Sequence, residues 1–252
     1  MDEGMTSYAT SLCMAELFAS AETGENVSPH RQAFGGYMGH ATSGNEEPLV
    51  THADHYILNR SYGVAAYSKG EVLLAQLAAV IGDEARDTGL KNYYRNWQFK
   101  HPGPIELKRE MERASGIELD WYFQYFINSV AQIDYRVGQV AISKSSDDPS
   151  SITLEKLGVM PMPLDVTVHY VDGSEDRFHI PLRMMRGHRP LAQDETLLED
   201  WPWTHPEYTF NFSPRGEVTK IVIDPAKKWA DVDRANNDIQ FRTDLQQFFE
   251  AE

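Results

Sequence analysis

The sequence has a single cysteine and no unbroken apolar run of the length that a membrane span needs. One thiol, Cys13, excludes an internal disulfide and any zinc site built from several cysteines. Because spanning a bilayer takes about 20 apolar residues, we expect no membrane span in this chain. Cys13 stands between Leu12 and Met14, which predicts a buried, unreactive thiol. The compartment stays open on these data.

Basic residues are also scarce relative to acidic ones. The chain has 23 lysines and arginines against 38 aspartates and glutamates, a formal net charge of −15. A nucleic-acid backbone would be repelled by this field, so we expect no nucleic-acid partner. The acid excess would attract a cationic group such as the free amino group of a peptide, although such a charge also simply keeps a protein soluble.

Two common kinds of catalytic motif are missing, and the histidines offer no clear metal site. There is no G-x-S-x-G sequence, and Gly35-Gly36 lacks the strand–turn–helix setting of a phosphate loop. His52 and His55 are three residues apart beside Asp54, a spacing that can chelate a metal on a helix. Pro48 precedes them, and we interpret the segment as a solvated loop. The other seven histidines are scattered singly.

The first half of the chain has apolar residues at helical spacing. The predicted helices cover residues 5–20, 29–39, 62–81, 83–97, 105–114 and 120–130. In the fourth of these, Leu90, Tyr93, Tyr94 and Trp97 are predicted to form the buried face.

Near residue 133 the period changes to the alternation typical of half-buried strands. The predicted strands cover residues 133–137, 139–142, 152–155, 164–170, 177–180, 208–212 and 220–223. Residues 183–207 are predicted to form a long loop. We therefore expect an α+β protein of two domains: helices over 1–132, an antiparallel β-sandwich over 133–230, and a polar tail over 231–252. Phe241, Leu245, Phe248 and Phe249 suggest a short helix in that tail.

Two short motifs resemble those of one enzyme family. Asp2-Glu3-Gly4 resembles the (N/D)-E-G motif of the M1 zinc aminopeptidases, which are gluzincin metallopeptidases. Tyr67-Ser68-Lys69-Gly70 is similar to the Y-x-K-G motif of the same family. The resemblance implies that Glu3 is a zinc ligand and that Tyr67 is the catalytic tyrosine. Without the resemblance to this family, the sequence pattern shows Tyr67 only as one aromatic residue on a helix face.

The chemistry implied for Tyr67 is physically reasonable. Attack of water on a peptide carbonyl creates an oxyanion, and a phenol with a pKa near 10 stays protonated and able to donate at neutral pH. A donor positioned in this way contributes about 3 kcal/mol to lowering the barrier.

Further segments extend the resemblance to about residue 237. They are 92–102, 110–123, Trp201-Pro202-Trp203 and Ile223-Asp224-Pro225. The family implies a fold: the mostly helical distal half of a thermolysin-like catalytic lobe, followed by an antiparallel Ig-like β-sandwich.

The H-E-x-x-H motif of this family is absent from all 252 residues. Histidines four apart on a helix share one face and bind the metal together, while the glutamate activates water. We therefore expect the C-terminal portion of a longer enzyme that hydrolyses peptide substrates. Its missing N-terminal half would supply two histidines and the general-base glutamate. The resemblance implies zinc in the intact enzyme, not held by this chain alone, so the isolated chain should be inactive.

Two alternatives remain open. The chain could be a non-catalytic module that keeps the peptidase scaffold to bind peptides or a partner. Alternatively, the helices could be a scaffold for a β-sandwich that is itself the working surface.

Overall fold

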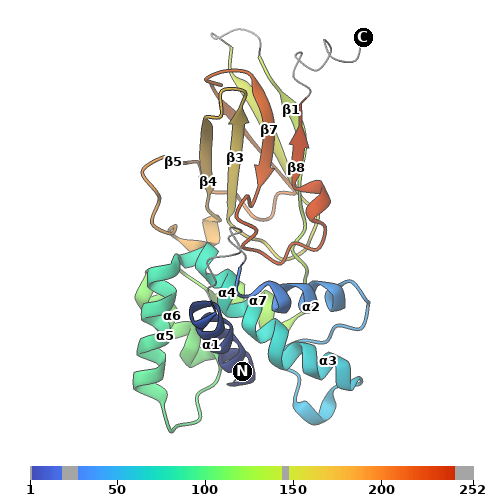
Figure 1. Ribbon diagram of the computed structural model, residues 1–252, viewed down its shortest axis with the longest axis vertical. Coiled ribbons are helices and arrows are strands. Elements are labelled where there is room, and N and C mark those ends of the chain that lie inside the picture. Colours follow the sequence, from blue (N-terminus) through green and yellow to red (C-terminus); the bar gives the residue numbers. More distant parts are fainter. Residues whose placement is uncertain (1, 19–27, 144–147, 242–252) are drawn as a thin grey trace. The chain divides into compact units, whose positions relative to one another are not determined.

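The structure is a computed structural model that describes residues 2–18, 28–143 and 148–241 (Figure 1). The chain divides into two compact units. The first, helical, holds the described residues up to Gln132 together with Met185–Arg189 and Lys228–Val232. The second, built of strands, holds Ile133–Met184, Pro190–Lys227 and the described residues from Asp233 onward. The chain is thus an α+β protein in which a helical part precedes a β part.

The helical unit contains α-helices, one 3-10 helix and one π-helix. They are α1 (Asp2–Leu17), α2 (Arg31–Ala41), η1 (Ala53–His55), α3 (Asn59–Gly63), η2 (Val64–Lys69), α4 (Gly70–Ile81), α5 (Asp83–Trp97), α6 (Pro104–Ser115) and α7 (Asp120–Asn128). The segment η2 is the π-helix.

The core of this unit is α4. Its apolar residues Val72, Leu77, Val80 and Ile81 are at most 1% exposed, since this helix is surrounded by the rest of the unit. On α7, the hydroxyl of the fully buried Tyr122 donates to the carbonyl of Leu73 at 2.7 Å. The chain returns here near its end, where the Ala230 amide donates to the Gln76 side chain at 3.2 Å.

The elements α3, η2 and α4 run on as one helix over Asn59–Ile81. This stretch is long and apolar enough, by length and composition, to cross a membrane, although polar residues interrupt its apolar run. Inside the helical unit 72% of its most apolar 18-residue window is buried, which is the placement of a core helix.

Local signals set the helix boundaries around α5 and α6. Gly82, with a φ of 88°, ends α4, and Asp83 with Glu84 opens α5, where acidic side chains favour the positive end of the helix dipole. In α6, the Glu106 carboxylate accepts the Gly103 amide at 2.7 Å, and Gly116 ends the helix in the left-handed region.

The predicted buried face of α5 is wrong. The buried residues of this helix are Arg86 and Gly89. Tyr94 is 67% exposed, and Leu90, Tyr93 and Trp97 are only half-buried. The helix contacts its neighbours along the close-packed Gly89 side, where an added Cβ would lie 2.5 Å from the sulfur of Met111 on α6.

Cys13 is exposed, contrary to the sequence-based expectation of a buried thiol. Only Gly4 and Tyr8 of α1 are buried. The C-terminal half of α1 is therefore not covered by the described part of the chain, although its sequence is apolar.

The second unit is a pair of sheets. Its strands are β1 (Tyr135–Ala141), β2 (Ser150–Lys156), β3 (Leu164–Tyr170), β4 (Glu175–Ile180), β5 (Glu195–Leu197), β6 (Glu207–Phe212), β7 (Val218–Ile223) and β8 (Asp238–Gln240). One sheet has the order β1-β2-β6 and the other β5-β4-β3-β7-β8. All neighbouring strands are antiparallel except β4 and β5, which are parallel. Short 3-10 turns, η3 (Arg183–Met185) and η4 (Arg234–Asn236), also occur along the chain.

Aromatic side chains join the two sheets. The Phe178 ring on β4 lies 5.2 Å from the Phe210 ring on β6, centroid to centroid. Strands of both sheets alternate buried and less buried residues, as β2 does with Ile152 and Leu154 fully buried. This two-sheet arrangement is compatible with an Ig-like sandwich.

The predicted loop and the predicted polar tail each contain a strand. The stretch 183–207 carries β5, and the predicted tail carries β8, which pairs with β7. Both strands have three residues, too short to show the alternation that predicts a strand. In the predicted tail helix, Leu245, Phe248 and Phe249 lie outside the described residues.

Candidate active site

Glu3 lies in the first turn of α1. Its side chain is half-buried, and the neighbouring Gly4 is fully buried. An acidic residue in this position is stabilised by the positive end of the helix dipole. The motif Asp2-Glu3-Gly4 therefore begins a helix, with its carboxylate close to the surface.

Tyr67 lies within the π-helix η2, in the middle of the long helix. Its side chain is 45% exposed. A π segment inserts an extra residue into a helix, changes the direction of the side chains around it, and occurs often at functional sites. The position of Tyr67 in such a segment makes its exposure within a mostly buried helix understandable.

The structure brings these two residues together. The Glu3 carboxylate lies near the Tyr67 hydroxyl and raises the pKa of the Tyr67 phenol above its ordinary value of 10.0, first through side-chain hydrogen bonding and then through its negative charge. Tyr62 makes a smaller contribution in the same direction. The phenol is thus a protonated donor throughout the neutral range.

Lys69, which the sequence motif contains but to which we assigned no role, anchors η2. Its side chain is 2% exposed, and its amino group donates to the Glu46 carboxylate at 2.6 Å and to the Ser129 carbonyl at 3.2 Å. The amino group also lies 5.5 Å from the ring centroid of Tyr37 and 5.2 Å from that of Phe126. Burial lowers the pKa of Lys69, and the Glu46 charge opposes this shift.

This role was visible in the sequence only as an anomaly. Lys69 is a charged residue on an apolar helical pattern, and such a residue needs a partner when it is buried. The partner, Glu46, comes from the loop after α2, which no periodicity in the sequence marks. The ion pair holds η2, and with it Tyr67, against the body of the helical unit.

A second buried polar group lies next to the motif glycine Gly70. The Glu71 carboxylate lies 2.7 Å from Nδ1 of His30, and both side chains are less than 10% exposed. The His30 ring stacks on Tyr8 of α1 at 4.7 Å between ring centroids. These contacts join α1 to α4 close to the two sequence motifs.

The residues around Glu3 do not form a complete zinc site. A catalytic zinc generally takes three protein ligands and a water. In the described part of the chain, one trio of possible ligands converges, Glu112, Glu118 and Asp120, and Glu3 is not among them. The Lys108 amino group is hydrogen-bonded to Asp120 and lies 3.8 Å from Glu112, so this acidic trio already has a cation. Glu3 alone does not fit a resident zinc ion.

His52 and His55 do not form a metal site with Asp54. Their ring centroids are 5.3 Å apart, and the side chains of all three residues are exposed at η1 and the residue before it. Nδ1 of His52 caps η1 by accepting the Asp54 amide at 3.3 Å. The segment is exposed to solvent, as interpreted from the sequence, but Asp54 and His55 lie in the 3-10 helix η1 and not in a loop.

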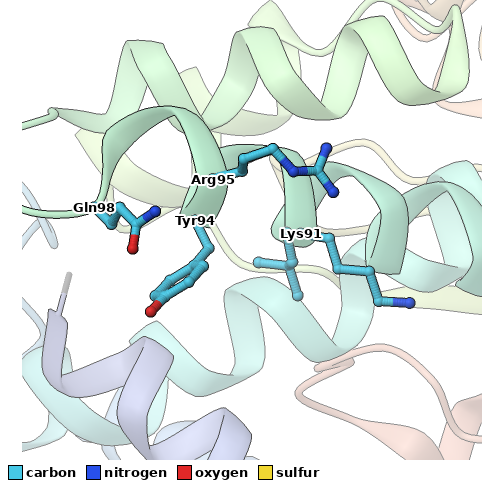
Figure 2. A pocket seen from close by; sticks show the side chains of 5 residues that line it. Lys91, Tyr94, Arg95 and Gln98 are labelled. Carbon is cyan, nitrogen blue, oxygen red and sulfur yellow. The ribbon is translucent and has the colours of Figure 1, made fainter.

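Two apolar hollows lie beside α5, away from Glu3 and Tyr67. The hollow of Figure 2, about 450 Å³, is lined by Leu90, Lys91, Tyr94, Arg95 and Gln98. A second hollow, about 380 Å³, lies between α1 and α5, and its lining includes Leu90, Tyr94 and Gln98. Neither is lined by Glu3 or Tyr67, so the site rests on the contact between those two residues and not on cavity size.

Comparison with known proteins gives the family. No curated protein sequence matches this chain. Among solved structures, the chain resembles Legionella pneumophila aminopeptidase A in complex with aspartic acid, with a TM-score of 0.53 and 13% sequence identity. The match covers 91% of this chain and 23% of that chain, so this chain spans about a quarter of that protein. At this identity the likeness shows the fold alone.

The family model described as peptidase family M1 domain matches residues 1–126, which is half of the chain. This match includes both motifs, Asp2-Glu3-Gly4 and Tyr67-Ser68-Lys69-Gly70. The chain belongs to peptidase family M1.

Proposed function

We propose that this chain is the C-terminal portion of a zinc-dependent aminopeptidase that removes N-terminal residues from peptides. The observation that carries the proposal is the close approach of the two motifs at Gly4 and Gly70, which brings Glu3 near Tyr67. The two residues come from separate motifs far apart in the sequence, and the packing of those motifs against each other supports the proposal. A coincidental resemblance at either motif would not predict this contact.

Each residue has a distinct role in this proposal. Tyr67 is a protonated phenol that donates a hydrogen bond to the oxyanion formed when a peptide carbonyl is attacked. Glu3 offers one carboxylate as a ligand to zinc, which in the bound state would activate the attacking water. The two histidine ligands and the general-base glutamate would come from an H-E-x-x-H segment outside these 252 residues.

The exposed half of α1 supports a larger functional protein. Met14, Leu17 and Phe18, which share one side of the helix, are between 50% and 75% exposed. A group of exposed apolar side chains usually marks a place where another part of a protein packs. We propose that the segment carrying the remaining ligands covers this face.

The alternative starts from the absence of an H-E-x-x-H motif in these 252 residues. In it, the chain is a non-catalytic module that keeps the peptidase scaffold to bind a peptide or a partner. The two proposals differ in what completes the protein: the aminopeptidase needs an H-E-x-x-H segment, encoded in the same reading frame or on a second polypeptide, and the module needs none.

The purified chain can be tested directly. Zinc would be titrated into it by calorimetry, and hydrolysis of aminoacyl-p-nitroanilides would be followed with zinc present. We expect neither stoichiometric zinc binding nor turnover, because Glu3 is a single ligand. Glu3→Gln serves as the matched control, and it should leave any weak, non-stoichiometric zinc binding unchanged. If the purified chain bound zinc stoichiometrically, lost that binding in Glu3→Gln and hydrolysed the substrate, the proposal that the site needs residues from another segment would be wrong.

A further inference from the structure

The two sequence motifs touch at their glycines. Gly4 of α1 and Gly70 at the start of α4 are both buried. A Cβ added to Gly4 would lie 2.5 Å from Cα of Gly70 and 2.6 Å from its carbonyl carbon. A Cβ added to Gly70 would lie 2.9 Å from Cα of Gly4. The clashing atoms belong to the backbone, so no side-chain rotation relieves them.

This contact lies next to the candidate site. Gly4 directly follows Glu3, and Gly70 is about one helical turn after Tyr67. Glycine is a poor helix former, so two glycines facing each other inside helices indicate that close approach, and not helix propensity, determines the residue type here.

We infer that Gly4 and Gly70 are positioning residues whose backbone contact sets the distance between the Glu3 carboxylate and the Tyr67 phenol. A side chain on either glycine separates α1 from the long helix and moves the Glu3 carboxylate away from the Tyr67 phenol. The buried Lys69–Glu46 pair fixes η2 next to Gly70, so the long helix does not move to accommodate a methyl group. The catalytic meaning of this spacing rests on the proposed function, whereas the spacing itself does not.

Other glycines of the unit provide matched controls. A Cβ at Gly63, in the same long helix, would meet no heavy atom within 4 Å. At Gly36 the nearest atom is the hydroxyl of Ser68 at 3.1 Å, the end of a side chain that can rotate. Alanine is therefore compatible with Gly63 and forbidden at Gly4 and Gly70.

The test uses NMR of the chain labelled with ¹³C at Cζ of tyrosine. The Tyr67 signal is assigned by its loss in Tyr67→Phe, and Glu3→Ala gives the shift of the phenol without the neighbouring carboxylate. We expect Gly4→Ala and Gly70→Ala to move the Tyr67 signal toward that same shift and to lower the melting temperature. Gly63→Ala should leave the signal in place and should not lower the melting temperature.

If folded Gly4→Ala or Gly70→Ala protein kept the wild-type Tyr67 signal, the inference would be wrong. The unsubstituted chain provides a second measurement in case a variant fails to fold. Cross-relaxation between the Hα protons of Gly4 and Gly70 should be strong, and its absence would overturn the inference. Neither experiment uses zinc or substrate, so their outcome is independent of whether the protein is a peptidase.

Discussion

At the residue scale, the chain supplies a donor and an acceptor whose side chains meet at the surface. Hydrogen bonding to the Glu3 carboxylate and its negative charge raise the pKa of the Tyr67 phenol. Tyr67 lies in the π segment and is exposed, whereas Lys69, two residues later in the same segment, is buried with Glu46. Within one short motif, one residue faces solvent and another anchors the helix.

Tyr8 carries a buried hydroxyl that limits the free energy of unfolding of the helical unit. Among the residues that the structure describes, its buried hydroxyl has no hydrogen-bond partner, and burial raises the pKa of the phenol to about 12. We expect Tyr8→Phe to leave the free energy of unfolding at neutral pH unchanged or to raise it by up to about 1 kcal/mol, since an unpaired polar group is removed. Chemical denaturation of both proteins measures this difference.

The pH dependence of unfolding gives a sharper comparison between the wild-type protein and Tyr8→Phe. The folded pKa of Tyr8 lies above the unfolded value near 10, so its contribution is fully present below about pH 10 and is lost as pH rises toward about pH 12. Tyr8→Phe should therefore lose less stability over this window than the wild-type protein. A loss of more than about 1 kcal/mol at neutral pH would show that the hydroxyl is hydrogen-bonded.

These residue roles were only partly visible in the sequence. The two motifs pointed to Glu3 and Tyr67, and the structure places both side chains in contact, although their roles remain proposals. The sequence could not show that Tyr8 stacks on His30 or that Lys69 pairs with Glu46, because these contacts join segments without a shared pattern. Cys13 was placed wrongly, because an apolar neighbourhood in sequence does not tell whether a second element covers it.

At the scale of elements, the ion pair between Lys69 and Glu46 connects η2 to the loop after α2. We expect Glu46→Gln to destabilise the chain by about 3–5 kcal/mol, because a buried ammonium loses its counter-charge. The double variant Lys69→Met with Glu46→Gln should be much closer to the wild-type protein, since it buries no unpaired charge. Urea denaturation of the three proteins measures the difference.

The titration of Lys69 predicts how the destabilisation caused by Glu46→Gln changes with pH. Its folded pKa lies below the ordinary value of 10.5, so the unfolded chain binds more protons between these two values and this term becomes more favourable to folding as pH rises. Removing the Glu46 charge lowers the folded pKa of Lys69 further. The deficit of Glu46→Gln should thus shrink as the pH rises toward the ordinary lysine pKa of 10.5. If Glu46→Gln and the double variant lost the same free energy of unfolding, an uncompensated charge on Lys69 would be ruled out as the cause.

Element positions followed from periodicity where a segment was long. The helix α5 spans Asp83–Trp97, as predicted, because Gly82 and the acidic pair after it mark its start. Its buried face was nevertheless wrong, because a close contact at Gly89 decided which side packs. The π segment η2 left no trace in the pattern, since one extra residue barely disturbs a helical period, and β5 and β8 were too short to be recognised.

At the scale of the whole molecule, the described part of the chain leaves apolar residues of the C-terminal half of α1 exposed, and under the proposed function a further segment packs there. Leu17 is 75% exposed, so Leu17→Glu should change the free energy of unfolding by less than about 0.5 kcal/mol. The same change should reduce self-association in sedimentation velocity, because it places a charge on the apolar face.

Leu77→Glu is the matched control for this surface. Leu77 lies on α4 with no exposed area, and a glutamate there should unfold the helical unit. If Leu17→Glu were as destabilising as Leu77→Glu, the C-terminal half of α1 would be part of the core of this chain. The account of a face awaiting another segment would then have to be abandoned.

The central claim is that Glu3 and Tyr67 form part of a peptidase site that other residues complete. The most direct measurement is aminoacyl-p-nitroanilide hydrolysis by this chain combined with the polypeptide that carries the H-E-x-x-H segment, with zinc present. We predict turnover only in the combination, its loss in Glu3→Gln, and a fall in kcat of about 10²–10³-fold in Tyr67→Phe with little change in KM. Full activity of the combination carrying both Glu3→Gln and Tyr67→Phe would contradict the account.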